Sequence, residues 1–168
     1  MRVIISGAFG HIGSFLINKF QKDNRIKKIL LIDNFTTQRY SVFLKLKKEK
    51  FELIDENLEK MNFKKIKKKY DIFIHLAAIT NAAESFKIKD KLIKNNYGCT
   101  KKIVQFCKHN DIKLIFPSST SVYGKKDGIV NEDNKSHLNP QSPYADIKLK
   151  EEEMLKRNSK KLRYTTFR

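Results

Sequence analysis

Tyr144 and Lys148 could act together as an acid–base pair on an alcohol. They lie four residues apart in a stretch of helical character, so their side chains share one face of a helix. A free phenol has a pKa of about 10, too high for a base at neutral pH, and a neighbouring ammonium group lowers it. The pair can then take a hydroxyl proton while a hydride leaves the same carbon. Because the pattern is frequent, an exposed helical pair is the alternative in so lysine-rich a chain.

A serine that follows a predicted strand favours the catalytic interpretation. Ser119 comes just after the strand expected at 113–116, within the run Pro117-Ser118-Ser119-Thr120-Ser121. Its hydroxyl could hydrogen-bond the substrate oxygen as that oxygen becomes a carbonyl. No histidine or acidic partner suggests a hydrolase triad. Alone, Ser119 would be an ordinary turn residue.

A glycine-rich segment at the start of the chain could hold a pyrophosphate. Gly7, Gly10 and Gly13 follow the apolar run at 2–6, and the helix expected at 11–23 begins among them. Glycines allow a tight turn and close approach to a ligand, and a helix N-terminus offers unpaired N–H groups and a positive dipole end. The spacing is G-x-x-G-x-x-G rather than the usual G-x-G-x-x-G. A plain glycine-rich turn is the alternative.

Two aspartates end the next two predicted strands. Asp33 lies 20 residues after Gly13, where a carboxylate can accept hydrogen bonds from both ribose hydroxyls of an adenosine. It would repel a 2′-phosphate, which favours NAD over NADP. Asp55 could accept from the adenine amino group. An ordinary strand-end aspartate is the alternative for each.

The elements that must position these residues alternate along the chain. Strands are expected at 2–6, 28–32, 51–54, 71–76, 113–116 and 162–167, and helices at 11–23, 40–48, 56–69, 84–108 and 143–158. Alternation implies parallel pairing with right-handed crossovers, hence a single α/β domain with an open, doubly wound, Rossmann-like sheet of about six strands. Gly7, Asp33, Asp55, Ala77 and Ser119 then lie at the carboxyl edge of that sheet, where ligands bind.

The composition is strongly basic, with a net charge of +18 from 36 basic and 18 acidic residues. The lysines are spread along the whole chain, and only six basic residues are arginine, the usual residue for bidentate phosphate recognition. Solvated lysine faces are therefore favoured over a nucleic-acid surface. No apolar run is long enough for a membrane span, and the first residues lack a signal-peptide pattern. With two cysteines, Cys99 and Cys107, and no metal-binding spacing, a cytoplasmic protein without a metal site is expected.

Together these motifs resemble the extended short-chain dehydrogenase/reductases, and specifically the NAD-dependent epimerase/dehydratase family. The resemblance covers nearly all 168 residues. Besides the glycine turn, it rests on Asp33-Asn34-Phe35-Thr36-Thr37, His75-Leu76-Ala77-Ala78, Asn95-Asn96-Tyr97-Gly98-Cys99-Thr100, Ser118-Ser119-Thr120-Ser121-Val122-Tyr123-Gly124 and Asn139-Pro140-Gln141-Ser142-Pro143-Tyr144. The last two resemble UDP-glucose 4-epimerases most closely.

The resemblance implies a role for each matching position. Ser119, Tyr144 and Lys148 would be catalytic. NAD would be held by Gly7, Phe9, Gly10, His11, Ile12, Gly13, Asp33, Asn34, Asp55, Ala77, Ala78, Thr80, Asn96, Tyr144 and Lys148. His11 could equally be a solvated residue at the helix start, and His75 is expected to pack at its strand end rather than to bind a ligand.

The resemblance also implies a nucleotide-sugar substrate, expected to be a UDP-sugar, and a homodimer formed through the helices at 84–108 and 143–158. Dehydratases of the family carry a glutamate at the position of Ser121, and many carry an aspartate at that of Thr120. The two hydroxyl residues favour a 4-epimerase, or a simple 4-reductase, over a dehydratase. The sequence stops inside the sixth strand, before the family's small substrate-binding domain. We therefore expect the chain to consist of the NAD-binding domain alone, either as a truncated fragment or as the product of a short gene, with a non-catalytic NAD-binding module as the alternative function.

Overall fold

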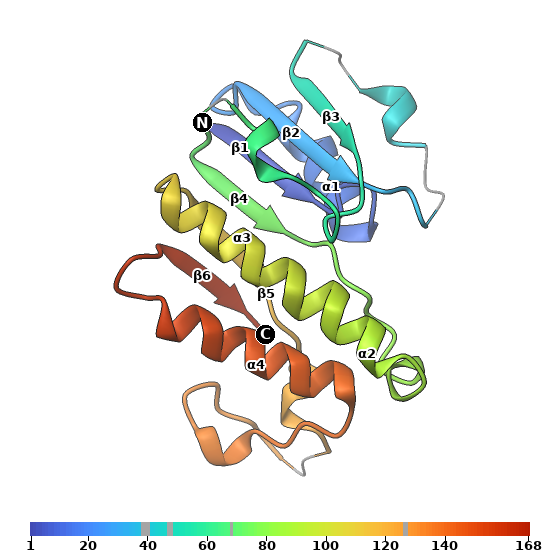
Figure 1. The fold of residues 1–168 in the computed structure, drawn as a ribbon, viewed down its shortest axis with the longest axis vertical. Helices are drawn as coiled ribbons and strands as arrows, with labels where there is room; N and C mark the ends of the chain where they lie inside the picture. Colours follow the sequence, from blue (N-terminus) through green and yellow to red (C-terminus); the bar gives the residue numbers. More distant parts are fainter. Residues whose placement is uncertain (38–40, 47–48, 68, 126–127) are drawn as a thin grey trace.

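The computed structural model describes residues 1–37, 41–46, 49–67, 69–125 and 128–168, which build one six-stranded parallel sheet (Figure 1). The strand order is β3-β2-β1-β4-β5-β6, so the chain starts in the middle and winds outward in both directions. The strands are β1 (Arg2–Ser6), β2 (Lys28–Asp33), β3 (Phe51–Asp55), β4 (Ile72–His75), β5 (Lys113–Pro117) and β6 (Tyr164–Phe167). This confirms the predicted doubly wound, Rossmann-like sheet.

The helices fill the connections between these strands. The longer ones are α1 (His11–Phe20), α3 (Gly98–His109) and α4 (Pro143–Arg157); shorter ones are α2 (Lys89–Leu92), the π-helix η4 (Ile93–Tyr97), and the 3₁₀ turns η1 (Phe43–Lys45), η2 (Phe63–Lys65), η3 (Glu84–Phe86), η5 (Thr120–Tyr123) and η6 (Lys135–His137). Ser142 caps α4, its hydroxyl accepting from the Ala145 N–H at 3.2 Å, and Pro143 occupies the first turn, as predicted.

The central strands are buried on both faces, which explains their continuous apolar runs. Alternate side chains separate into two cores. On one face, Ile5 and Leu31 pack with Ile17 of α1. On the other, Ile4 and Phe116 pack with side chains of α3 and α4, which lie side by side in Figure 1. The homodimer expected through these two helices stays a prediction.

The helix expected after Asp55 is absent from the described part of residues 56–69, which holds only turns and η2. Lysines at positions 64, 65 and 69 would crowd like charges along a helix and disfavour it. Leu58 and Met61 are buried, so the segment covers the sheet as a packed loop. The prediction of a basic helix is therefore wrong.

The other boundaries differ less. The first helix ends at Phe20 rather than residue 23, and β6 begins at Tyr164 rather than 162. Within the short helix expected at 40–48, residues 40, 47 and 48 lie outside the described residues, and only η1 forms between them. The long helix expected at 84–108 is divided into η3, α2, η4 and α3.

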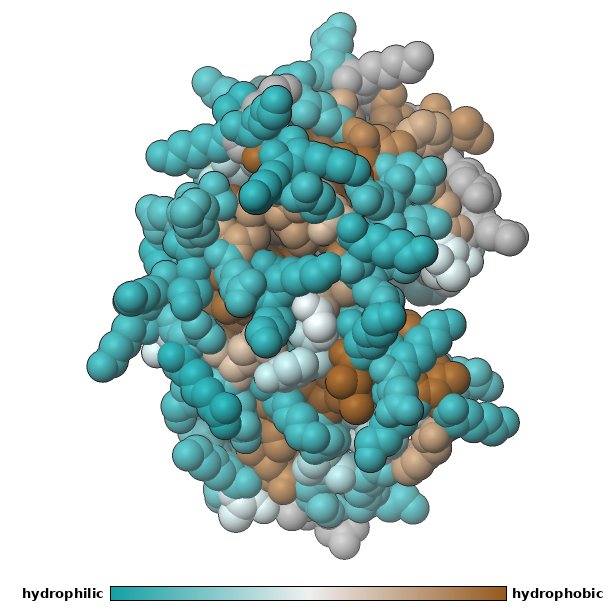
Figure 2. Space-filling view, viewed as in Figure 1, coloured by the Kyte–Doolittle hydropathy of each residue, from teal (hydrophilic) through white to brown (hydrophobic). Residues whose placement is uncertain are grey.

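Figure 2 shows that hydrophilic residues cover most of the face on which α3 and α4 lie, with apolar residues scattered among them. In the described residues, no helix is long and apolar enough to cross a membrane, and no three His, Cys, Asp or Glu residues are grouped to hold a metal ion.

Candidate functional site

The turn between β1 and α1 needs glycine at two of its three glycine positions. Gly7 has φ +67°, and a Cβ there would lie 2.6 Å from the backbone nitrogen of Ala77. A Cβ on Gly13 would lie 2.3 Å from the carbonyl oxygen of Ala8. Side chains cannot fit at such distances without backbone movement. The glycines therefore let the turn, the start of α1 and the end of β4 pack together.

The N-terminus of α1 is open to an anion. Gly10 is its N-cap, no side chain of the described residues caps it, and its first turn holds no acidic residue. The backbone N–H groups of His11, Ile12 and Gly13 therefore have no partner within the helix. His11 and Ile12 are exposed. These groups and the positive dipole end fit a pyrophosphate, so the residues present suit the cofactor that the sequence implies.

Asp33 is built into the glycine turn. One carboxylate oxygen accepts from the Phe9 N–H and the other from the Phe35 N–H, both at 2.8 Å. The rings of Phe9 and Phe35 stack with centroids 4.8 Å apart, which fixes the loop after β2 against the turn. Each oxygen keeps a second lone pair for a ribose hydroxyl.

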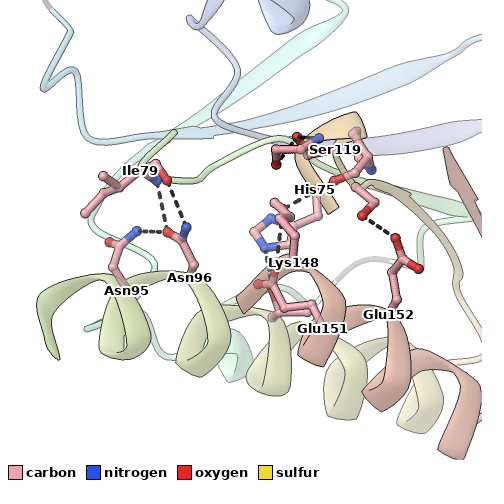
Figure 3. Close-up of polar contacts among 12 residues, drawn as sticks. His75, Ile79, Asn95, Asn96, Ser119, Lys148, Glu151 and Glu152 are labelled. Atoms are coloured by element: carbon pink, nitrogen blue, oxygen red, sulfur yellow. Dashed lines mark hydrogen bonds and ion pairs between the residues drawn. The ribbon is translucent and has the colours of Figure 1, made fainter. Parts of the chain in front are cut away.

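The remaining predicted cofactor contacts line the same carboxyl edge of the sheet. Asn34, Asp55 and Thr80 are exposed, whereas Ala77 and Ala78 are partly buried. Asn96 is buried and clamps the loop after β4: its amide accepts from the Ile79 N–H and donates to the Ile79 carbonyl, both at 2.9 Å (Figure 3). These contacts clamp the loop, and a contact between Asn96 and the cofactor stays a prediction.

Ser119 and Tyr144 meet, as the sequence predicts. Ser119 lies two residues after β5 and caps η5, and its hydroxyl lies 2.7 Å from the Ser121 hydroxyl and hydrogen-bonds Tyr144. Tyr144 is buried near the start of α4, where its N–H donates to the Ser85 hydroxyl at 3.3 Å. The side chains of Ser119 and Tyr144, 25 positions apart in the sequence, are thus in contact.

The pKa of Tyr144 is raised, contrary to the expectation from its spacing with Lys148. Burial raises the pKa most, the hydrogen bond from Ser119 lowers it, and the Glu151 carboxylate raises it. Lys148 points elsewhere. Its Nζ lies 3.2 Å from Glu151 Oε2, donates to the Pro117 carbonyl at 3.3 Å, and sits 4.4 Å from the centroid of the Phe116 ring. In this structure the lysine is not what sets the pKa of the tyrosine.

His75 belongs to a buried polar network rather than to simple packing. Its Nδ1 lies 2.8 Å from the Ser6 hydroxyl and its Nε2 lies 3.2 Å from the Thr100 hydroxyl. Burial, and secondarily the positive charge of Lys148, lowers the pKa of His75 to about 3. The ring is therefore neutral at neutral pH.

The buried histidine predicts a loss of stability in acid. The unfolded chain binds a proton near pH 6.5 and the folded chain only near pH 3, so stability rises with pH between these values. We expect His75 to contribute a slope of up to about 1.4 kcal/mol per pH unit, lost as the pH falls below 6.5. Urea unfolding of wild type and His75→Gln between pH 4 and 7 measures it, with exposed His109→Gln as the control. Equal slopes in wild type and His75→Gln would contradict the prediction.

A second polar cluster supports the segment that carries Ser119. Arg168 contacts both carboxylate oxygens of Glu152, at 2.9 Å and 2.6 Å, and donates to the Tyr123 hydroxyl at 3.1 Å. Glu152 also accepts from Ser118 (Figure 3). The cluster joins β6, α4 and the segment that carries Ser119. Sequence reasoning missed Glu151, Glu152 and Arg168, and it named Thr100 only within a motif of the family, without a role of its own.

The sheet order, the glycine turn and the open helix end define the class of protein: a Rossmann-like α/β protein. The pattern of one family, described as the NAD dependent epimerase/dehydratase family, matches residues 3–168. The chain belongs to this family, whose enzymes are NAD-dependent, and the resemblance seen in the sequence is confirmed.

Three relatives show the range of the family. The chain is 30% identical over 161 residues to an uncharacterized UDP-glucose epimerase of Bacillus subtilis, covering 92% of this chain and 50% of that protein. It is 32% identical over 164 residues to a dTDP-D-glucose 4,6-dehydratase of Dictyostelium discoideum, covering 86% and 37%. A crystal structure of a UDP-glucuronic acid 4-epimerase from Bacillus cereus, in complex with UDP-glucuronic acid and NAD, superimposes with a TM-score of 0.90 at 31% identity, covering 100% and 56%. The chain thus spans half or less of these two curated relatives.

Proposed function

We propose that the chain binds NAD at the glycine turn and acts in the C4 epimerisation of a UDP-sugar. The observation that carries this proposal is the shared location of two features. The open N-terminus of α1 and Asp33 lie at the carboxyl edge of the sheet, and Ser119, Tyr144 and Lys148 follow β5 at that same edge. The names of relatives that act on UDP-sugars, and a neighbour with NAD bound, support it.

The chain's own residues supply acid–base chemistry. Bound NAD would supply the hydride acceptor. Tyr144 Oη takes the proton from the sugar hydroxyl and later returns it, and Ser119 Oγ steadies both the phenol and the forming carbonyl oxygen. Lys148 places a positive charge next to Pro117, at the end of the strand that leads to Ser119.

Epimerisation is favoured over elimination of water because the segment after Ser119 offers no carboxyl group. Elimination needs an added acid and base, whereas Thr120 and Ser121 carry hydroxyls. The Ser121 hydroxyl lies 2.7 Å from that of Ser119 and supports its position instead. A 4-reductase activity would use the same acid–base groups and is the alternative function of this site.

Calorimetry with NAD⁺ tests the proposal. We expect NAD⁺ to bind, and Asp33→Asn to weaken binding by about tenfold, because a charged acceptor of the ribose hydroxyls is lost. The preference for NAD⁺ over NADP⁺ should shrink in the same variant. Asp133→Asn, at an exposed loop position, is the control.

The outcomes separate the alternatives. Absence of NAD⁺ binding to the wild-type chain would refute the proposal. Binding of NAD⁺ without any effect of UDP-sugars would favour the non-catalytic NAD-binding module. Binding of both, with exchange between UDP-glucose and UDP-galactose or another 4-epimer pair detected by NMR, is the result we expect.

A further inference from the structure

Glu151 is an acidic residue in the middle of the core. Its side chain is 1% exposed and lies one turn after Lys148 on α4. Burying a carboxylate is costly unless it is paired and hydrogen-bonded. Glu151 is paired at one oxygen and hydrogen-bonded at the other. Oε2 forms an ion pair with Lys148 Nζ at 3.2 Å and has no hydrogen-bond partner among the described residues, whereas Oε1 accepts from the Thr100 hydroxyl at 2.5 Å.

The contact with Thr100 continues across the sheet. Thr100 of α3 meets His75 at the end of β4, and His75 meets Ser6 at the end of β1 (Figure 3). These contacts form a row of five buried residues: Ser6, His75, Thr100, Glu151 and Lys148. The row therefore connects the strand that leads into the glycine turn with the lysine of the candidate catalytic pair.

The chemistry of the row fixes the direction of every hydrogen bond. A carboxylate only accepts, so the Thr100 proton goes to Glu151 and Thr100 must accept from His75. The neutral ring of His75 therefore carries its proton on Nε2, and Nδ1 accepts from the Ser6 hydroxyl. One tautomer satisfies the whole row, and the other leaves the carboxylate without its donor.

We propose that Glu151 is a positioning residue, which holds the Lys148 ammonium in place and is itself fixed by the row Thr100–His75–Ser6. The proposal rests on the proposed function only in taking Lys148 as part of the active site. Without Glu151, the contacts left to the ammonium are the Pro117 carbonyl and the Phe116 ring. A buried cation without a counter-charge loses its proton or turns toward solvent.

Glu151 also raises the pKa of Tyr144, which lies two helical turns earlier on the same face. The described groups near this carboxylate are Lys148 on its own helix and Thr100 and Cys99 on α3, and His75 of β4 contacts it through Thr100. Among these groups, His75 and Cys99 are neutral at neutral pH, because burial lowers the pKa of His75 to about 3 and raises that of Cys99 to about 11. The carboxylate is thus a specific source of negative charge near the tyrosine.

The first test uses the wild-type chain without cofactor. NMR of ¹⁵N-labelled protein reports which ring nitrogen of His75 carries the proton between pH 5 and 8, with assignment by His75→Gln. We expect the Nε2–H tautomer throughout. The Nδ1–H tautomer, or a charged ring, would overturn the proposal because Thr100 would then have no proton for Glu151.

The second test replaces Glu151 by Gln. The Tyr144 titration is isolated as the absorbance change near 295 nm that is lost with Tyr144→Phe, in wild type and in Glu151→Gln. We expect its midpoint to fall by about one pH unit in Glu151→Gln, the effect of one charge roughly 10 Å away. Glu151→Asp should restore most of the shift, and Glu153→Gln, an exposed position on the same helix, should leave the midpoint unchanged.

An unchanged Tyr144 midpoint in Glu151→Gln would overturn the proposal. Equal midpoints in the Gln and Asp variants would also overturn it, because a side chain that only fills space, without an effect of its charge, would give that result. If Glu151→Gln does not fold, the Asp variant and the wild-type tautomer decide. Neither measurement needs NAD, so a failure of NAD binding counts against the proposed function and leaves the role of Glu151 to be judged on its own.

Discussion

Replacing Tyr144 by phenylalanine is expected to slow turnover by about 10²–10⁴-fold, the usual contribution of a positioned acid–base group. The variant removes one oxygen from a buried ring, so folding should be preserved. Because burial and Glu151 raise the pKa of Tyr144, wild-type activity should increase with pH as the phenol loses its proton. The measurement is conversion of a UDP-sugar to its 4-epimer in the presence of NAD⁺, followed by NMR.

A matched control is Tyr164→Phe, which removes the same oxygen from β6 and should leave the rate unchanged. Binding of NAD⁺ by the Tyr144→Phe variant should persist, since the glycine turn and Asp33 are untouched. If turnover in Tyr144→Phe matches the wild type, Tyr144 is not the base.

Replacing Gly13 by alanine is expected to lower the free energy of unfolding by about 3 kcal/mol. The added methyl group would lie 2.3 Å from the Ala8 carbonyl oxygen and 2.6 Å from that of Gly7. Both atoms are backbone of the turn itself, so relief requires α1 to move away from it. The same movement displaces the N–H groups proposed for the pyrophosphate, and NAD⁺ affinity should fall with stability.

Gly98→Ala provides the contrasting substitution. Gly98 begins α3, and a methyl group there would come no closer than 3.9 Å to the Ile93 carbonyl oxygen. Alanine in a helix is favoured over glycine, so this variant should gain about 0.5–1 kcal/mol. Urea unfolding of both variants measures the difference. Equal midpoints for Gly13→Ala and wild type would show that the turn can accept a side chain.

The sheet could be predicted because its strands are continuous apolar runs separated by helical patterns, and parallel topology follows from that alternation. The segment after Asp55 could not. Leu58 and Met61 have a spacing that suits a helix, but they reach the core from turns. Local periodicity does not show whether neighbouring lysines can be tolerated along the exposed face of such a helix.

The candidate site also was predictable from the sequence only in part. Ser119 and Tyr144 could be paired from the sequence because each follows a recognisable element. The electrostatic environment of Tyr144 could not be predicted, because Glu151 is held in the core by Thr100 of α3, a contact between segments far apart in the sequence. A signal was present: Glu151 falls on the buried stripe of α4, seven residues after Tyr144 and four before Leu155. An acidic residue at such a position needs a partner in the core, and Lys148 is one turn away.

The glycine turn also has a consequence for the order in which the chain folds. The turn lies at the beginning of the sequence, yet Ser6 beside it bonds His75, 69 residues further along, and Gly7 packs on Ala77. Of the two neighbours of β1 in the sheet, β2 follows it closely along the chain, whereas β4 comes only after β3. The turn is therefore completed only after β4 has joined the sheet, and such distant pairings form slowly. The glycine turn thus becomes competent for a ligand only when β1 and β4, two strands distant in the sequence, have paired.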